Sequence, residues 1–402
     1  MFSGLKKKRI YLDYAAATPV SPEVLSAMTP FFKGDFGNPS SIHNEGVNAR
    51  NAIEEARSNL AQALHIRPDG IIFTGSGTEC NNIAIMGIVE THRKKGVAYV
   101  DMHIISTAIE HASVFEVLKH LETLGVAVTF VAVDGEGIIK TALFKESLTP
   151  KTILVAISYV NSEIGVIQPI GKLARIVRAY EKEMMATICI HVDAAQAPLW
   201  LPCSLDSLSC DTLALDAGKC YGPKGIGVLA IRHGIVLEPY LFGGGQERGL
   251  RSGTENTALI VGGALALCSA QQECHVHSEE VTALRDFFIV QLLKIEGVVL
   301  NGSPSLRVAN NVNISIEGID AEFAIISLNE KGIACATKSA CGSQDGAGSS
   351  VVNAISHDPA RALSSLRFSL GLQTTKDELN FVAVSLEAHV LHTRKVLQNL
   401  TA

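Results

Sequence analysis

The sequence predicts an α/β protein that has a seven-stranded, mostly parallel sheet and a smaller α+β domain. Between residues 71 and 232, short apolar runs rich in β-branched residues alternate with helical periods, as in a doubly wound sheet. After Thr257 a long helical stretch replaces this alternation. A chain of 402 residues is long enough for two or three domains with a cleft between them.

Seven apolar runs are expected to form the strands of the large sheet. In order they are residues 71–75, 103–107, 128–134, 152–158, 188–193, 211–216 and 227–232. Proline and glycine residues interrupt the pattern between these runs and mark the connections. We expect the large domain to span residues 15–257.

The rest of the chain is expected to form the smaller domain. We predict a strand near residues 310–316, a helix near 322–331, a strand near 363–370 and a final helix over 378–397. Residues 1–14 are expected to pack with this part. The smaller domain would therefore consist of residues 1–14 and 258–402.

Composition narrows the class of function. With 34 Lys and Arg against 40 Asp and Glu, the chain has no broad basic field for nucleic acid. The longest smooth apolar segment, residues 258–268, is much shorter than the roughly 20 residues of a membrane span. Nine cysteines without a Cys-x-x-Cys pair are typical of reduced thiols. We expect a cytoplasmic protein that binds neither nucleic acid nor membrane.

Two predicted strands end in residues suited to binding a charged ligand at the carboxyl edge of the sheet. Gly77 and Thr78 follow the first strand, where free N–H groups at a helix start favour an anion such as phosphate. Asp193 and Gln196 end another strand, and a buried carboxylate needs a cation such as the protonated ring of pyridoxal phosphate (PLP). Each pattern alone is also compatible with an ordinary turn or helix cap.

Lys219 and Cys341 are candidate reactive residues. Lys219 follows an apolar strand among small residues, and an apolar pocket lowers the pKa of a lysine, as a Schiff-base amine requires. Cys341 begins a stretch rich in Gly and Ser that could carry a thiol between sites. A surface lysine and an unimportant loop cysteine are the ordinary alternatives.

His111 and Arg367 complete the set. His111 ends a predicted strand and could stack on a ring or move a proton, or be merely structural. Arg367 interrupts an apolar strand, where a guanidinium requires a planar anion such as a carboxylate. Cys268 and Cys274 lie six residues apart in a predicted helix and so face different sides, and we expect no metal site.

Together these motifs resemble the NifS-like cysteine desulfurases, which are class V aminotransferases with the aspartate-aminotransferase-like fold (fold type I PLP enzymes). Residues 11–28, 36–43, 243–257 and 364–371 carry the resemblance further along the chain. It implies that PLP forms a covalent Schiff base with Lys219. Asp193 would hold the pyridine nitrogen, Gln196 the ring hydroxyl and His111 the ring face.

The resemblance also implies contacts at the other end of the cofactor. Gly77 and Thr78 would hold the phosphate together with Thr254 of a neighbouring subunit, which implies a homodimer. Arg367 would bind the carboxylate of the substrate L-cysteine, with Asn161 beside it.

Four positions depart from the family pattern. Asp216 and Gly218 replace a Ser-x-His pair near the phosphate, Ser162 replaces an asparagine near the ring hydroxyl, and Lys338 replaces a glycine three residues before Cys341. We count the first three among the cofactor-binding positions. A carboxylate about 4 Å from a phosphate charge would cost on the order of 4 kcal/mol at an effective dielectric near 20. Asp216 is therefore expected to point away or to be neutralised. Lys338 could lower the pKa of the Cys341 thiol or be merely solvated.

The expected function is PLP-dependent conversion of L-cysteine to L-alanine. The sulfur would leave as a persulfide on Cys341 for an acceptor protein in iron-sulfur cluster assembly or tRNA thiolation. A selenocysteine lyase or another class V enzyme is an alternative that would not need Cys341. A non-catalytic scaffold in a sulfur-transfer complex is a second alternative, motivated by Asp216 and Gly218.

Overall fold

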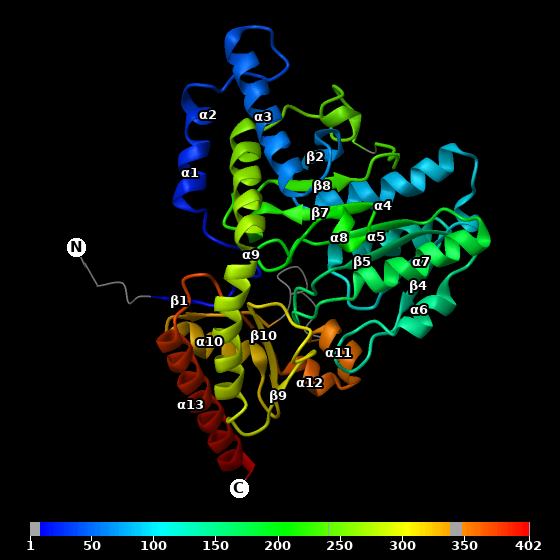
Figure 1. Ribbon diagram of the computed structural model, residues 1–402. Coiled ribbons are helices and arrows are strands. Elements are labelled where there is room, and N and C mark those ends of the chain that lie inside the picture. Colours follow the sequence, from blue (N-terminus) through cyan, green and yellow to red (C-terminus); the bar gives the residue numbers. More distant parts are fainter. Residues whose placement is uncertain (1–8, 240, 338–347, 402) are drawn as a thin grey trace.

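The computed structural model describes residues 9–239, 241–337 and 348–401. Its largest sheet has seven strands in the order β2-β8-β7-β6-β5-β3-β4 (Figure 1). Their bounds are β2 Ile71–Thr74, β3 His103–Thr107, β4 Ala127–Val131, β5 Thr152–Ser158, β6 Cys189–Asp193, β7 Thr212–Asp216 and β8 Gly227–Ile231. Strands β3 to β7 are parallel, whereas β8 runs antiparallel to both of its neighbours. The predicted seven-stranded, mostly parallel sheet is confirmed.

Helices cover both faces of this sheet. The core on one side is formed with α4 (Gly77–Lys94) and α5 (Ala112–Thr123). The core on the other side includes α3 (Asn44–Ala63), α7 (Ile170–Met184), α8 (Leu205–Leu208) and the first part of α9 (Thr257–Leu292). Because both faces are covered, the central strands β5 and β6 are buried along their whole length.

Two helices begin where side chains cap the backbone at the carboxyl edge of the sheet. The Ser76 hydroxyl accepts a hydrogen bond from the Glu79 N–H at the start of α4. His111 Nδ1 accepts from the Ser113 N–H at the start of α5. Such caps satisfy donors that the helix itself leaves without partners. They also fix the loops in which predicted site residues lie.

A three-stranded antiparallel sheet, β12-β10-β9, lies in the C-terminal half, and β1 pairs in parallel with β11. The strand bounds are β1 Ile10–Tyr11, β9 Val298–Leu300, β10 Asn311–Ile316, β11 Ile333–Ala334 and β12 Ser365–Ser369. The remaining helices are α1 Pro22–Met28, α2 Pro30–Lys33, α6 Thr141–Ser147, α10 Ala321–Glu330, α11 Ser350–Ser356, α12 Pro359–Leu363 and α13 Lys376–Thr401. The strands and helices expected in this half are present, with β9 and β11 in addition.

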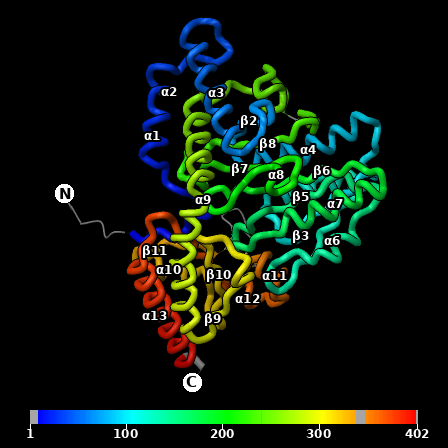
Figure 2. Tube along the Cα trace, viewed as in Figure 1, coloured from blue at the N-terminus to red at the C-terminus, as the bar shows by residue number. Residues whose placement is uncertain are grey.

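The long helix α9 connects the two sheets. Figures 1 and 2 show it beside α3 at one end and beside α13 at the other, in agreement with its contacts to both. The division into residues 15–257 and residues 1–14 with 258–402 stays a prediction. No helix in the described part of the chain is long and apolar enough to cross a membrane.

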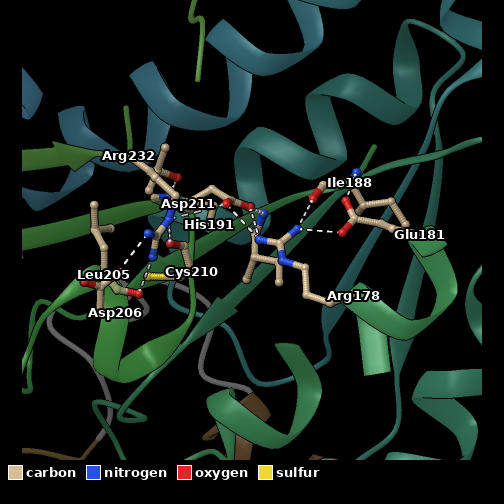
Figure 3. Close-up of polar contacts among 11 residues, drawn as sticks. Arg178, Glu181, Ile188, His191, Leu205, Asp206, Cys210, Asp211 and Arg232 are labelled. Atoms are coloured by element: carbon tan, nitrogen blue, oxygen red, sulfur yellow. Dashed lines mark hydrogen bonds and ion pairs between the residues drawn. The ribbon is translucent and has the colours of Figure 1, made fainter. Parts of the chain in front are cut away.

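Paired charges fix the starting ends of β6 and β7. Asp211 accepts two hydrogen bonds from Arg178, at 2.7 and 2.6 Å, and one from the Ile190 N–H at 2.8 Å. Arg232 approaches the same carboxylate at 3.8 Å and also pairs with Asp206 (Figure 3). These contacts are far from the carboxyl edge and serve the packing of the sheet.

Candidate active site

A cavity of ≈ 170 Å³ lies at the carboxyl edge of the large sheet. Most of the predicted site residues line it: Gly77, Thr78, His111, Ser162, Asp193, Gln196, Asp216, Lys219 and Arg367. They come from the ends of β2, β3, β5, β6 and β7 and from β12 of the smaller sheet. The parallel strands bring these residues together because their carboxyl ends meet at one edge.

Asp193 forms the floor of the cavity, where other residues orient it. Its Oδ2 accepts from the Asn81 side-chain amide at 2.8 Å, and its Oδ1 accepts from the Ala195 N–H at 3.0 Å. His191 Nε2 lies 3.0 Å from Asn81 Oδ1, and burial lowers the His191 pKa to about 3. A neutral His191 that donates to Asn81 leaves the amide of Asn81 free to donate to Asp193. Sequence reasoning missed Asn81 and His191, although both flank motifs that it identified.

Lys219 and Gln196 both reach the backbone of an N-terminal segment. Lys219 Nζ donates to the Ala16 carbonyl at 2.5 Å, and Gln196 Nε2 donates to the Ala15 carbonyl at 2.9 Å. Lys219 ends a 3₁₀ turn (Ala217–Lys219) directly after β7, and the turn directs its side chain into the cavity. Ala15 and Ala16, which sequence analysis did not single out, form part of the wall.

His111 borders the cavity and caps α5. Its Nδ1 accepts from the Ser113 N–H at 3.1 Å and lies 2.8 Å from the Ser113 hydroxyl. The same hydroxyl accepts from Asn81 at 2.8 Å, which links His111 to the amide that orients Asp193. The ring of His111 is thereby held at the mouth of the cavity.

Glu110 is a buried acid that sequence analysis did not identify. Its Oε2 accepts from the Ser158 N–H at 2.8 Å and from the Ser158 hydroxyl at 2.5 Å, and its Oε1 accepts from the Thr107 hydroxyl at 2.6 Å. Burial raises the pKa of Glu110 to about 7, and the charge of Asp193 adds to the rise. Ser158 lines the cavity, so Glu110 fixes part of its wall.

Arg367 lies almost fully buried in β12, with 2% of its surface exposed. Its guanidinium donates to Asp13 Oδ1 at 2.7 Å and to the Ser162 carbonyl at 3.0 Å. Within the described residues, its buried Nε has no hydrogen-bond partner. Since an unpaired buried donor is costly, the cavity beside Arg367 suits an anion.

The rim near α4 contains Asp216. Its Oδ2 accepts from the Gly77 N–H at 3.2 Å, and its Oδ1 accepts from the Gly218 N–H at 2.9 Å. Asp216 thus faces this turn, and the expectation that it points away from a bound phosphate or is neutralised stays a prediction. The backbone N–H groups attract the carboxylate in the way that they would attract any anion.

Three predicted residues that the structure describes, Asn161, Thr254 and Gly218, are not part of the cavity wall. The side chain of Asn161 donates to the Ile109 carbonyl in the loop before α5 and accepts from the N–H groups of Glu163 and Ile164 in its own loop. Thr254 is exposed, and Gly218 is buried behind Asp216. Cys341 lies outside the described residues, as does Lys338.

Cys335, another thiol near Cys341 in sequence, is partly buried. Burial raises its pKa to about 12, so this thiol is a poor nucleophile at neutral pH. Among the described residues there is no group of three or more His, Cys, Asp or Glu side chains that could hold a metal ion.

The cavity fits PLP by the chemistry of its donors. A carboxylate at the floor suits a protonated ring nitrogen, an amine lies within the same cavity, and Arg367 has an unpaired donor for a carboxylate. Gly77 begins an 18-residue helix, a position suited to a phosphate. The carboxylate of Asp216 on Gly77 is unfavourable to that phosphate.

Comparison with known proteins is consistent with this chemistry. The aminotransferase class-V family profile matches residues 10–382. A cysteine desulfurase IscS from Dictyoglomus turgidum is 42% identical, with 97% of this chain and 96% of the relative covered.

Solved structures agree with the sequence comparison. One described as a NifS-like protein has a TM-score of 0.88 and 33% identity, covering 96% of this chain and 100% of that one. Another, described as SspA in complex with cysteine, has a TM-score of 0.77 and 32% identity, covering 92% and 100%. The chain is an enzyme that belongs to the aminotransferase class-V family and, within it, to the NifS-like cysteine desulfurases, whose cofactor is PLP.

Proposed function

We propose that this enzyme converts L-cysteine to L-alanine and transfers the sulfur to an acceptor through a persulfide on Cys341. The observation that supports it most is that Lys219, Asp193 and Arg367 line one cavity. Relatives named cysteine desulfurase, and one structural neighbour described in complex with cysteine, support the choice of substrate.

PLP would be held by residues at the two ends of the cavity. Lys219 would bind it covalently as a Schiff base, Asp193 would accept a hydrogen bond from the protonated ring nitrogen, and Gln196 would contact the ring hydroxyl. His111 at the mouth would cover the ring. When bound, PLP withdraws electrons from the substrate bonds at Cα and so makes the Cα proton acidic.

Arg367 would bind and orient the carboxylate of the substrate. Its unpaired Nε and its neighbour Asp13 support this role, because Asp13 holds the guanidinium plane in one orientation. The amine of Lys219, which lies in the same cavity, would then take the proton from Cα. Ser162, whose carbonyl contacts Arg367, would help fix the substrate end.

Cys341 would act as the nucleophile that takes the sulfur. In the net reaction the Cβ–S bond of cysteine breaks, an S–S bond forms on Cys341, and the carbon skeleton leaves as alanine. Cys335 is unsuited to this role, since its thiol has a pKa of about 12. The persulfide would pass to an acceptor protein, of the kind used in iron-sulfur cluster assembly or tRNA thiolation.

The test is release of alanine and sulfide from L-cysteine by PLP-loaded protein with a thiol reductant. Cys341→Ser should abolish both products, and Cys335→Ser serves as the matched control that should retain both. Equal activity of wild type and Cys341→Ser would contradict the role of Cys341 and favour a lyase. A wild type that binds PLP but makes no alanine would contradict the desulfurase proposal and favour the scaffold alternative.

We further propose a homodimer in which Thr254 approaches the cofactor site of the partner subunit. Thr254 is exposed, and the segment near it carries an exposed apolar side chain, Phe242, at 80% exposure. Phe36 and Ile42, at 70% and 95%, are also exposed. Sedimentation equilibrium of wild type and Phe242→Asp would test this, with dissociation expected for the variant. The cytoplasmic location stays a prediction.

A further inference from the structure

Asp216 lies where the cofactor phosphate would be bound. It is the last residue of β7, and its carboxylate accepts from the first N–H of the helix α4, that of Gly77, at 3.2 Å. A second hydrogen bond, from the Gly218 N–H at 2.9 Å, fixes the other oxygen. The carboxylate therefore occupies the position at which a helix start attracts an anion.

Other N–H groups of the same turn already donate to side-chain oxygens of this chain. The Gly75 N–H donates to Glu79 Oε2 at 2.6 Å, and the Glu79 N–H donates to the Ser76 hydroxyl at 3.2 Å. The Glu79 carboxylate is compensated by Arg251 at 2.9 Å. Asp216 makes no ion pair within the described part of the chain. Its charge thus adds to the negative potential where a phosphate would arrive.

Gly218 makes room for this carboxylate. A Cβ atom at position 218 would lie 3.1 Å from Asp216 Oδ1, which is closer than ordinary van der Waals contact. Lys224 Cγ lies 3.6 Å from the same point on another side, and the Lys224 amine donates to the Thr18 carbonyl. A side chain at 218 would therefore crowd Asp216, whose carboxylate would have to shift by a few tenths of an ångström.

We propose that Asp216, accommodated by Gly218, weakens the binding of the cofactor phosphate, so that this chain holds PLP chiefly through its ring and Lys219. The proposal rests on the proposed PLP-dependent function. Its measure is the affinity of PLP relative to pyridoxal, which has the same ring and aldehyde but no phosphate. The wild type gains less affinity from the phosphate than a variant without the carboxylate charge.

The experiment is equilibrium titration of the full-length apoprotein with PLP and with pyridoxal, followed by the imine absorbance band and by protein fluorescence. Asp216→Asn removes the charge at constant shape, and Asp216→Ser removes the charge and most of the side chain. Asp69→Asn, at an exposed residue that pairs with Arg67 outside the cavity, is the control with the same change in net charge. Gly218→His is added in the wild type and in the Asp216→Ser background.

Both Asp216 variants should bind PLP at least about tenfold more tightly, which corresponds to about 1.4 kcal/mol, while pyridoxal affinity stays within about twofold. Asp69→Asn should change neither. Gly218→His should tighten PLP only together with Asp216→Ser. If wild type binds PLP and neither Asp216 variant binds it more tightly, the proposal is overturned. If no protein forms an imine with either ligand, the PLP-dependent function itself fails, and the inference with it.

Discussion

Asp211 and Asp216 stand at opposite ends of the same strand, β7, and differ in their partners. Asp211, directly before the strand, accepts two hydrogen bonds from Arg178 and has Arg232 nearby (Figure 3). Asp216, at the carboxyl end, accepts only from backbone N–H groups among the contacts of the described residues. One carboxylate is compensated by cations, whereas the other faces a cavity.

We therefore expect the carboxylate at the start of the strand to affect stability and the one at its carboxyl end to affect ligand binding. A paired and buried carboxylate stabilises the fold only while its cations remain, and removing one partner leaves a costly buried charge. A carboxylate on helix N–H groups contributes little to packing but sets the potential of the cavity. Substitutions at the two ends should therefore affect different measurements.

The largest loss of stability is expected at a second ion pair, in which both partners are buried, unlike the pair between Asp211 and Arg178. Arg57 and Glu247 are about 5% and 3% exposed, and they pair at 2.7 Å beside β2. Glu247→Ala should lower the free energy of unfolding by about 3–5 kcal/mol. Urea unfolding measures this. A loss below about 1 kcal/mol would show that the pair contributes no more than a surface ion pair.

Asp211→Asn should lower the free energy of unfolding by about 2–3 kcal/mol, because it removes the charge between Arg178 and Arg232. The loss is smaller than at Glu247 since Arg178 is partly exposed to solvent, which screens its charge. Urea unfolding combined with an unchanged PLP affinity would confirm a purely structural role. An altered PLP affinity would contradict it.

Glu110→Gln should change the dependence of stability on pH. Burial raises the Glu110 pKa from 4.5 to about 7, so the folded state keeps a proton that the unfolded state has lost. This makes wild type less stable as pH rises from about 4.5 to 7, with the full cost above 7. Glutamine has no such cost. The variant should therefore gain on the order of 1–3 kcal/mol relative to wild type between pH 5 and pH 8. A pH-independent difference in urea unfolding would contradict this.

Asp216→Asn should have the smallest effect on stability, about 1 kcal/mol or less, because the asparagine oxygen can keep one of the two hydrogen bonds that the carboxylate accepts and no buried cation loses its partner. The matched substitution Asp211→Asn makes the contrast direct, since both change one carboxylate to an amide on the same strand. Equal losses at the two positions in urea unfolding would contradict the division between a structural and a functional end.

Much of the fold could be predicted from periodicity. Strands β5 and β6 read as continuous apolar runs because both of their faces are buried, and each lies within one or two residues of its expected bounds. The short strands β9 and β11 were missed because two or three residues carry no period. Their existence depends on partners distant in sequence, β10 and β1.

The candidate site was predictable where a residue type is chemically unusual in its position. Asp193, Lys219 and Arg367 are charged residues beside apolar strands, and all three line the cavity. Asn81 and Glu110 escaped notice because an amide or an acid next to a helix start is common in loops and caps. Only the tertiary contacts to Asp193 and Ser158 give these two residues a role.

The sequence by itself determined the alternation of strands and helices and the membership of a PLP enzyme family, because these follow from local pattern and residue chemistry. Only the tertiary structure decided the direction of the Asp216 side chain. Sequence reasoning left it pointing away or neutralised, since a carboxylate and a phosphate repel. The N–H groups of Gly77 and Gly218, which are 141 residues apart, both donate to its carboxylate instead.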